Sequence, residues 1–191
     1  IGAADGREIY EAQPRFRVLM ENGAGSSTPG LPAPRFELGF RKWPPPRTRK
    51  TRWYFGPTGT LTRPRPMLDG FDSYNPHPDA RPMQTIAGQG QSESWEVMPP
   101  YDWRPLVDGT GVAYVTPPLT DPVTIVGPGS VDLWLRSSAV DTDVQVTLSE
   151  VRPDGLETYV QSGWLRASHR LLDPKKDKPL EPWPTHLEQD A

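Results

Sequence analysis

The sequence predicts an all-β fold, an antiparallel β-sandwich centred on residues 114–170. In this stretch short apolar segments alternate with period two and are separated by turn residues, as half-buried strands require. The 191 residues include 25 prolines and 17 glycines, which favour many loops and few helices. Seven tryptophans and the clear strand patterns argue against a disordered chain.

The N-terminal part predicts a short helix and one strand. The helix is expected around residues 7–12, and Phe16, Val18 and Met20 begin a strand that ends at an Asn-Gly pair. Residues 25–34 are rich in glycine, serine and proline and have little capacity to bury anything. We therefore expect a domain boundary near this stretch.

A basic, proline-rich stretch covers residues 41–50. Its three consecutive prolines favour an extended polyproline II segment, and we expect a solvated linker that Trp43 anchors to a neighbouring domain. The alternative is a docking site for an anionic partner or for an SH3-type domain.

Two short strands and a long loop are expected next. Residues 53–55 and Leu61 flank the turn sequence Gly-Pro-Thr-Gly, which predicts two strands around a turn. Residues 66–103 have a loop-like composition. A loop of this length in a compact domain is usually functional or packed on a partner.

The centre of the predicted sandwich is a series of short strands, over residues 112–116, 123–125, 131–136 and 144–149. Alternation puts Trp134 on the face opposite Leu133 and Leu135, so we expect it to contact something other than the core of this sandwich. A last strand is expected from Leu156 onward, with a break at Gly163 and two registers open.

Four residues, Asp141, Asp143, Asp154 and Gly155, are predicted to shape turns. Asp154 and Gly155 follow a proline in a tight connection, where aspartate can bond its own backbone and glycine takes positive φ. The Asp-Thr-Asp triplet at 141–143 resembles the start of a calcium loop, but the glycine and glutamate that an EF-hand needs further on are missing. We expect the triplet to bend the chain by accepting backbone N–H bonds. A calcium site of another kind and an interface role stay open.

No catalytic or metal-binding constellation is visible in the sequence. The nucleophile motif G-x-S-x-G of α/β-hydrolases is absent, and Ser26 and Ser130 lie in turns with no helix following. His77, His169 and His186 are not spaced from one another or from carboxylates as metal ligands are, so ordinary surface positions are expected. We predict no catalytic residue, no metal and no cofactor in this chain.

Charge and composition exclude some classes of binding partner. The net charge of -3 gives the whole molecule no electrostatic reason to bind nucleic acid. No apolar run approaches the ~20 residues that a membrane span needs, and no signal peptide is present, so we expect no membrane partner. The absence of cysteine excludes disulfides and thiol nucleophiles but leaves the compartment open, with the cytoplasm slightly favoured.

Several segments together resemble a known family. The resemblance is to the C-terminal jelly-roll, galactose-binding-like domain of the X-Pro dipeptidyl-peptidase and cocaine-esterase-like serine hydrolases. The matching segments are residues 118–123, 137–143, 151–155 and 163–167, with 17–20, 43–45, 53–55, 59–61, 74–78 and 102–104 upstream in the same order. The resemblance covers roughly residues 15–172.

This resemblance implies a two-part organisation. Residues 1–45 would be the tail of an α/β-hydrolase domain and a linker, and residues 46–191 a jelly roll that lacks its last strands. The catalytic triad of the family lies N-terminal to the strand that 17–20 matches, so no triad residue is carried over. The implied partner is the α/β-hydrolase domain of the same parent protein, and unpaired strand edges make a homo-oligomer possible.

The resemblance also implies a contribution to the substrate pocket. In cocaine-esterase-like members a loop of the β-domain supplies apolar residues to the acyl pocket, and residues 91–103 are best placed to match it. Trp95, Tyr101 and Trp103 could supply apolar area there and exclude water. The alternative is that these aromatic side chains cover the sandwich core.

Two other functions compete with a non-catalytic domain of a serine hydrolase. A stand-alone β-sandwich module could bind carbohydrate on an aromatic platform formed by Trp95, Tyr101, Trp103 and Trp134. An interaction domain without a ligand is the other. An exposed aromatic row would favour the carbohydrate module.

Overall fold

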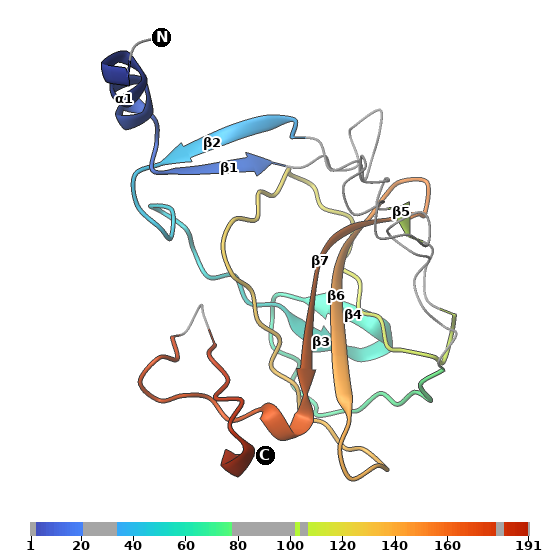
Figure 1. Cartoon of the computed structure of the whole chain (residues 1–191). Helices are drawn as coiled ribbons and strands as arrows, with labels where there is room; N and C mark the ends of the chain where they lie inside the picture. The colour runs from blue at the N-terminus through green and yellow to red at the C-terminus, as the bar shows by residue number, and fades with distance from the viewer. Residues whose placement is uncertain (1–2, 21–33, 78–101, 104–106, 179–181, 191) are drawn as a thin grey trace, which may run out of the picture. The chain divides into compact units, whose positions relative to one another are not determined.

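A computed structural model of the chain describes residues 3–20, 34–77, 102–103, 107–178 and 182–190 (Figure 1). The chain divides into two compact units, one of residues 1–126 with 151–158 and one of residues 127–150 with 159–191. The described part is mostly β, with small sheets and a single α-helix. This mostly β composition is consistent with the predicted all-β domain, while the jelly-roll arrangement, the division at residue 45 and the remnant of an α/β-hydrolase domain before it stay predictions.

Helix α1 and the first sheet form the N-terminal part. Helix α1 runs over Ala3–Ala12, a few residues longer than predicted, and ends just before Pro14, whose ring disfavours helical backbone in the residue before it. Strand β1, Phe16–Met20, is confirmed and pairs antiparallel with β2, Phe36–Phe40. Sequence reasoning missed β2, although its apolar residues alternate with period two.

Side chains on this two-stranded sheet make one charged and one aromatic contact. Arg17 of β1 forms an ion pair with Glu37 of β2. The ring of Trp43, which follows β2, lies 6.0 Å from the ring of Phe16 between centroids. Trp43 thus packs on strand β1.

A short hairpin follows, as predicted. Strands β3, Tyr54–Gly56, and β4, Thr60–Thr62, pair antiparallel around a 3₁₀ turn at Pro57–Gly59. Gly59 has a φ of +70°, and a Cβ at this position would lie 2.9 Å from the carbonyl oxygen of Ala113. Glycine is therefore required here for both the backbone conformation and the close approach.

Residues 113–115 attach to this hairpin. The backbone N–H groups of Val115 and Leu61 donate to the carbonyls of Gly59 and Val115, over 2.8 and 2.9 Å. The predicted strand at 112–116 is reduced to a single bridge between Thr60 and Val115. The Tyr114 hydroxyl donates to Asp72 at 2.5 Å, and burial together with this bond raises the pKa of Tyr114 to about 12.

Two long strands dominate the remaining sheet, whose order is β5-β7-β6. Strand β6, Asp143–Val151, and strand β7, Glu157–Arg166, form a hairpin, and the two-residue β5, Asp102–Trp103, pairs antiparallel with the start of β7 (Figure 1). The Thr147 and Ser162 hydroxyls lie 3.0 Å apart across the hairpin. Because side chains alternate along a strand, Val144 and Val146 lie on the face of the hairpin opposite Thr147, and both are half-buried.

Three expectations for this region are wrong. Residues 123–125 and 131–136 form no strand, and Val131 and Leu133 are 45% and 47% exposed. Alternation alone does not make a strand, and none of the described residues pairs with these two segments. Gly163 does not break β7, which runs uninterrupted through it, because an extended glycine needs no special φ.

Burial in the described part is shallow. No large side chain among these residues is fully buried, Trp134 and Val140 are fully exposed, and Trp164 is 68% exposed. Trp134 therefore does not pack in a core formed by the described residues, as expected. Within the same part of the chain, no helix is long and apolar enough to cross a membrane.

Candidate functional site

The predicted pocket segment is held where it joins the large sheet. Of its three aromatic residues, Trp103 lies in β5, while Trp95 and Tyr101 lie outside the described residues. In β5, Asp102 pairs with Thr158 and Trp103 pairs with Glu157. The C-terminal end of the segment is thus joined by backbone pairing to the first two residues of β7.

The turn between β6 and β7 is built around a buried arginine. Arg152 is only 7% exposed, and its guanidinium donates to both carboxylate oxygens of Asp154, at 3.2 and 3.0 Å. It also donates to the hydroxyl of Thr158 at 3.2 Å, and Thr158 is 3% exposed. Since Thr158 also pairs with Asp102, the arginine supports the position at which β5 attaches.

Asp154 and Gly155 complete this turn. The Asp154 carboxylate accepts the backbone N–H of Leu156 at 3.1 Å, and Gly155 has a φ of +81°. The side-chain hydrogen bond from Arg152 is the main reason why the pKa of Asp154 lies below its ordinary value. Asp154 therefore accepts a backbone N–H within the turn, and Gly155 supplies the positive φ that the turn needs. Both residues shape this turn as predicted.

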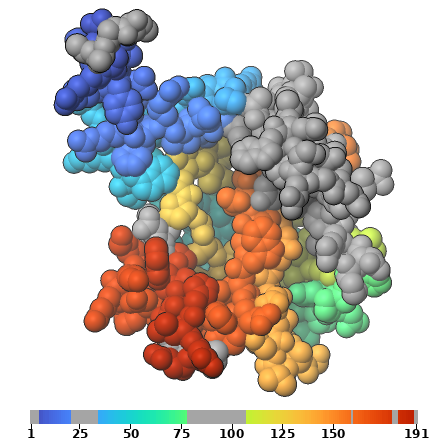
Figure 2. Space-filling model, in the orientation of Figure 1, coloured from blue at the N-terminus to red at the C-terminus, as the bar shows by residue number. Residues whose placement is uncertain are grey.

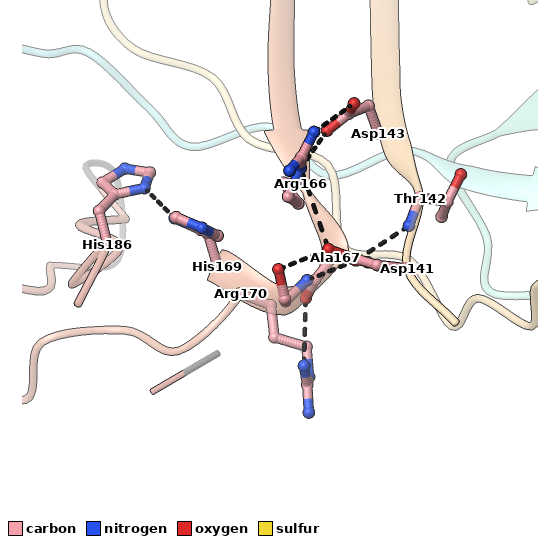
Figure 3. Close-up of polar contacts among 9 residues, drawn as sticks. Asp141, Thr142, Asp143, Arg166, Ala167, His169, Arg170 and His186 are labelled. Carbon is pink, nitrogen blue, oxygen red and sulfur yellow. Dashed lines mark hydrogen bonds and ion pairs between the residues drawn. The ribbon is translucent and has the colours of Figure 1, made fainter. Parts of the chain in front are cut away.

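A second polar group, the aspartate–arginine cluster, consists of Asp141, Asp143, Arg166 and Ser168, of which Figure 3 labels the first three. The Asp143 carboxylate accepts two hydrogen bonds from the Arg166 guanidinium, at 2.8 and 3.0 Å. Asp141 accepts the backbone N–H groups of Thr142 and Ser168, at 2.9 and 3.1 Å, and the Ser168 hydroxyl at 2.7 Å. The cluster joins the start of β6 to the end of β7.

The cluster was expected to shape a bend, and the two aspartates differ in how they bond. Asp141 accepts backbone N–H groups, whereas Asp143 accepts from the side-chain nitrogens of Arg166. Both carboxyl groups have a lowered pKa, mainly through the Ser168 hydroxyl for Asp141 and through Arg166 for Asp143. The hydrogen bonds of the cluster join residues at the start of β6 to residues at the end of β7. The cluster therefore stabilises the pairing of these two strands.

Removing the Ser168 hydroxyl is expected to raise the pKa of Asp141 toward its ordinary value, because this hydrogen bond is the largest cause of the lowered pKa. A carboxyl with a lowered folded-state pKa stabilises the fold fully above its unfolded value. That stabilisation is lost as the pH falls through the folded value. In Ser168→Ala, Asp141 should therefore contribute a smaller loss of stability on acidification than it does in the unchanged chain.

NMR titration of the Asp141 carboxyl carbon measures this change. The matched control is Thr147→Ala, which removes a hydroxyl contact of the same hairpin, with Ser162, and leaves the cluster intact. An unchanged Asp141 pKa in Ser168→Ala, or an equal rise in Thr147→Ala, contradicts the assigned cause.

The structure also brings together two histidines that the sequence separates by seventeen positions. The Nδ1 atoms of His169 and His186 lie 3.3 Å apart, and their ring centroids are 5.5 Å apart (Figure 3). Their sequence spacing indicated no such pair. The signal is tertiary, because antiparallel pairing of Leu172 with Pro184 brings the two segments together. Within the described ranges, no group of three or more histidine, aspartate or glutamate residues is arranged to hold a metal ion.

Comparison with known proteins identifies the family. The model of the X-Pro dipeptidyl-peptidase C-terminal non-catalytic domain matches residues 8–185 of the chain. The chain belongs to this family. The resemblance of the segments between residues 15 and 172 is thereby confirmed.

Three curated relatives extend the comparison. The chain is 32% identical to cocaine esterase of Rhodococcus sp. (strain MB1 Bresler) over 195 residues, which cover 91% of the chain and 34% of that protein. It is 29% identical, over 78% of its length, to "Putative serine esterase Mb1866c" of Mycobacterium bovis and to "Putative serine esterase MT1883" of Mycobacterium tuberculosis. The chain spans only 24% of each mycobacterial protein. No solved structure matches the chain significantly.

Proposed function

We propose that this chain is the non-catalytic β-domain of a serine hydrolase, and that it braces an α/β-hydrolase domain and shapes the substrate pocket of that domain. The observation that carries the proposal is the match of residues 8–185 to a family described as non-catalytic and C-terminal. The relatives add support, since proteins containing similar segments are named cocaine esterase and putative serine esterase. The proposed reaction of the whole protein is therefore hydrolysis of an ester or a related acyl bond.

The proposed arrangement follows the family. Residues 1–45 would end the hydrolase domain and cross to the β-domain, and residues 46–191 would form a jelly roll. The hairpin β6–β7 and the attached β5 are compatible with one sheet of such a sandwich. The residues that bind and cleave the substrate would lie on the α/β-hydrolase domain.

Bracing is supported by the exposed apolar surface. Leu133, Leu135 and Leu148 are each 45–49% exposed, and Trp164 is exposed on β7. Side chains of this kind are the ones that a partner domain would cover if they form one continuous apolar patch. We assign the α/β-hydrolase domain of the same protein as the partner.

Pocket shaping is supported by the attachment of β5. A loop that supplies apolar side chains to a pocket must be held at its ends, since a displacement of about 1 Å can cost a hundredfold in rate. Pairing of Trp103 with Glu157 holds one end of the 91–103 segment against a long strand. Trp95, Tyr101 and Trp103 are the side chains that would reach the acyl group.

An assay of the 191-residue chain alone tests the non-catalytic assignment. Incubation with an activated aryl ester should give no turnover above the buffer rate, because no triad is expected in the chain. Saturable turnover that stays with the chain through purification would overturn the proposal. Calorimetric titration with oligosaccharides tests the carbohydrate module, and saturable binding would favour that function instead.

A further inference from the structure

A strongly basic strip, residues 41–52, connects strands β2 and β3. It contains six arginine and lysine residues and no aspartate or glutamate, and all six basic residues are exposed. Figure 2 shows the light-blue to cyan stretch that contains them at the surface. Since the whole chain has a net charge of -3 and the strip contributes +6, the other residues carry -9. Positive charge is thus concentrated in one short segment of an otherwise acidic chain.

Most charges of the strip have no partner among the described residues. Five of its side chains form no ion pair or hydrogen bond there: Arg41, Lys42, Arg47, Arg49 and Arg52. Exposed basic residues elsewhere in the chain do have such partners, as in the ion pair between Arg17 and Glu37. A carboxylate that approaches the strip therefore meets guanidinium groups that need not first give up another acid.

Contacts at both ends hold the backbone of the strip. Pro45 is buried, and its carbonyl accepts the backbone N–H of Thr48 at 3.2 Å and the Thr48 hydroxyl at 2.8 Å. Beyond the other end, the Arg63 guanidinium lies 4.2 Å from the centre of the Trp53 ring, next to strand β3. A backbone that is already held loses less conformational entropy when a partner binds.

We propose that the basic strip binds a short acidic segment of a partner protein, in which aspartate or glutamate side chains follow one another closely. Four of the six basic residues are arginines, whose planar guanidinium can donate two parallel hydrogen bonds to one carboxylate. Residues 48–53 belong to no helix, strand or turn, so several of these side chains are spread along a stretch of irregular backbone. A row of carboxylates matches such a row of arginines.

The surroundings of the strip favour a short acidic segment over other partners. A long nucleic acid or an anionic membrane would also face the -9 carried by the other residues, which repels it. Single-stranded nucleic acid binds by stacking bases on aromatic rings, whereas Trp43 already contacts Phe16 and Trp53 already contacts Arg63. An SH3-type domain requires exposed prolines, and Pro45 is buried.

Fluorescence anisotropy with a labelled octaglutamate peptide tests the proposal on the 191-residue chain. We expect saturable binding of one peptide per chain at about 0.1 M salt, where the screening length is about 10 Å. At about 1 M salt this length falls to about 3 Å, and the affinity should fall by about tenfold or more. A labelled octalysine peptide should not bind the strip.

A charge-reversed double variant locates the binding. Arg49→Glu with Arg52→Glu should weaken octaglutamate binding by about tenfold or more, because like charges would then face each other. Arg49→Gln with Arg52→Gln removes the charges without reversing them and should weaken binding less. The matched control is Arg136→Glu with Lys175→Glu, two exposed residues outside the strip, which changes the net charge equally and should bind as the unchanged chain does.

Melting temperatures of these variants should stay unchanged, because exposed residues without partners contribute little to stability. The proposal is overturned by the absence of saturable octaglutamate binding, or by an equal loss of affinity in the control variant. Tighter binding of an eight-nucleotide oligothymidylate, or of phosphatidylserine vesicles, would also overturn it and assign the strip to nucleic acid or to a membrane surface. These outcomes do not bear on the hydrolase assignment, which rests on the family match.

Discussion

Replacing Arg152 with alanine is expected to lower the free energy of unfolding by about 2–3 kcal/mol, because the buried guanidinium and its hydrogen bonds are lost and the buried hydroxyl of Thr158 loses a donor. The Arg152 side chain is 6% exposed and donates to Asp154 and to the buried hydroxyl of Thr158. Without it, that hydroxyl loses one of its partners in a site with little access to water. Denaturation with urea, followed by circular dichroism, measures the loss.

The matched control for this prediction is Arg166→Ala on the same hairpin. Arg166 also binds an aspartate through two hydrogen bonds, but the two side chains are 56% and 68% exposed. Water replaces these bonds when the guanidinium is removed, so the change in stability should be clearly smaller. Equal losses in the two variants would show that burial of Arg152 does not decide its contribution.

Replacing Trp103 or Trp95 with alanine in the whole protein is expected to change its selectivity among acyl groups. If these side chains restrict the acyl side of the pocket, their removal should favour bulky acyl groups over small ones by about tenfold in relative kcat/KM, which corresponds to about 1.4 kcal/mol of differential binding. The measurement compares a series of activated esters of increasing acyl size.

A matched control for the pocket prediction is Trp134→Ala. Trp134 is fully exposed and lies outside the 91–103 segment, so its replacement should leave the order of acyl preferences unchanged. Unchanged preferences in Trp95→Ala and Trp103→Ala would support the alternative, in which these aromatic residues only cover the sandwich core. The assignment to the family would stand in either case.

Local signals in the sequence predicted the short-range elements correctly. Strand β1 and the hairpin of β3 and β4 were predicted from alternation and from the turn residues between 56 and 59, because both depend on neighbours close in sequence. The tight turn with Gly155 at positive φ followed from its turn residues in the same way. These elements need little information from the rest of the chain.

Long-range pairing accounts for the errors. The alternating residues at 131–136 form no strand, while Asp102–Trp103, within a stretch predicted as a loop, pairs with β7. Alternation states which residues can share a face, but a strand exists only where a partner offers a matching row of N–H and C=O groups. The partner of β5 lies more than fifty positions further along the chain, so no window of sequence contains both strands.

The candidate sites divide in the same way. Sequence alone determined the family and the predominantly β character, because these depend on residue identity and order, and it proposed residues 91–103 as the segment that reaches the pocket. Only the tertiary structure placed Arg152 beside Thr158, joined Asp143 to Arg166 and brought His169 to His186. Each of these contacts depends on how strands or loops pair in space, which fixes the direction and separation of side chains that the linear spacing leaves open.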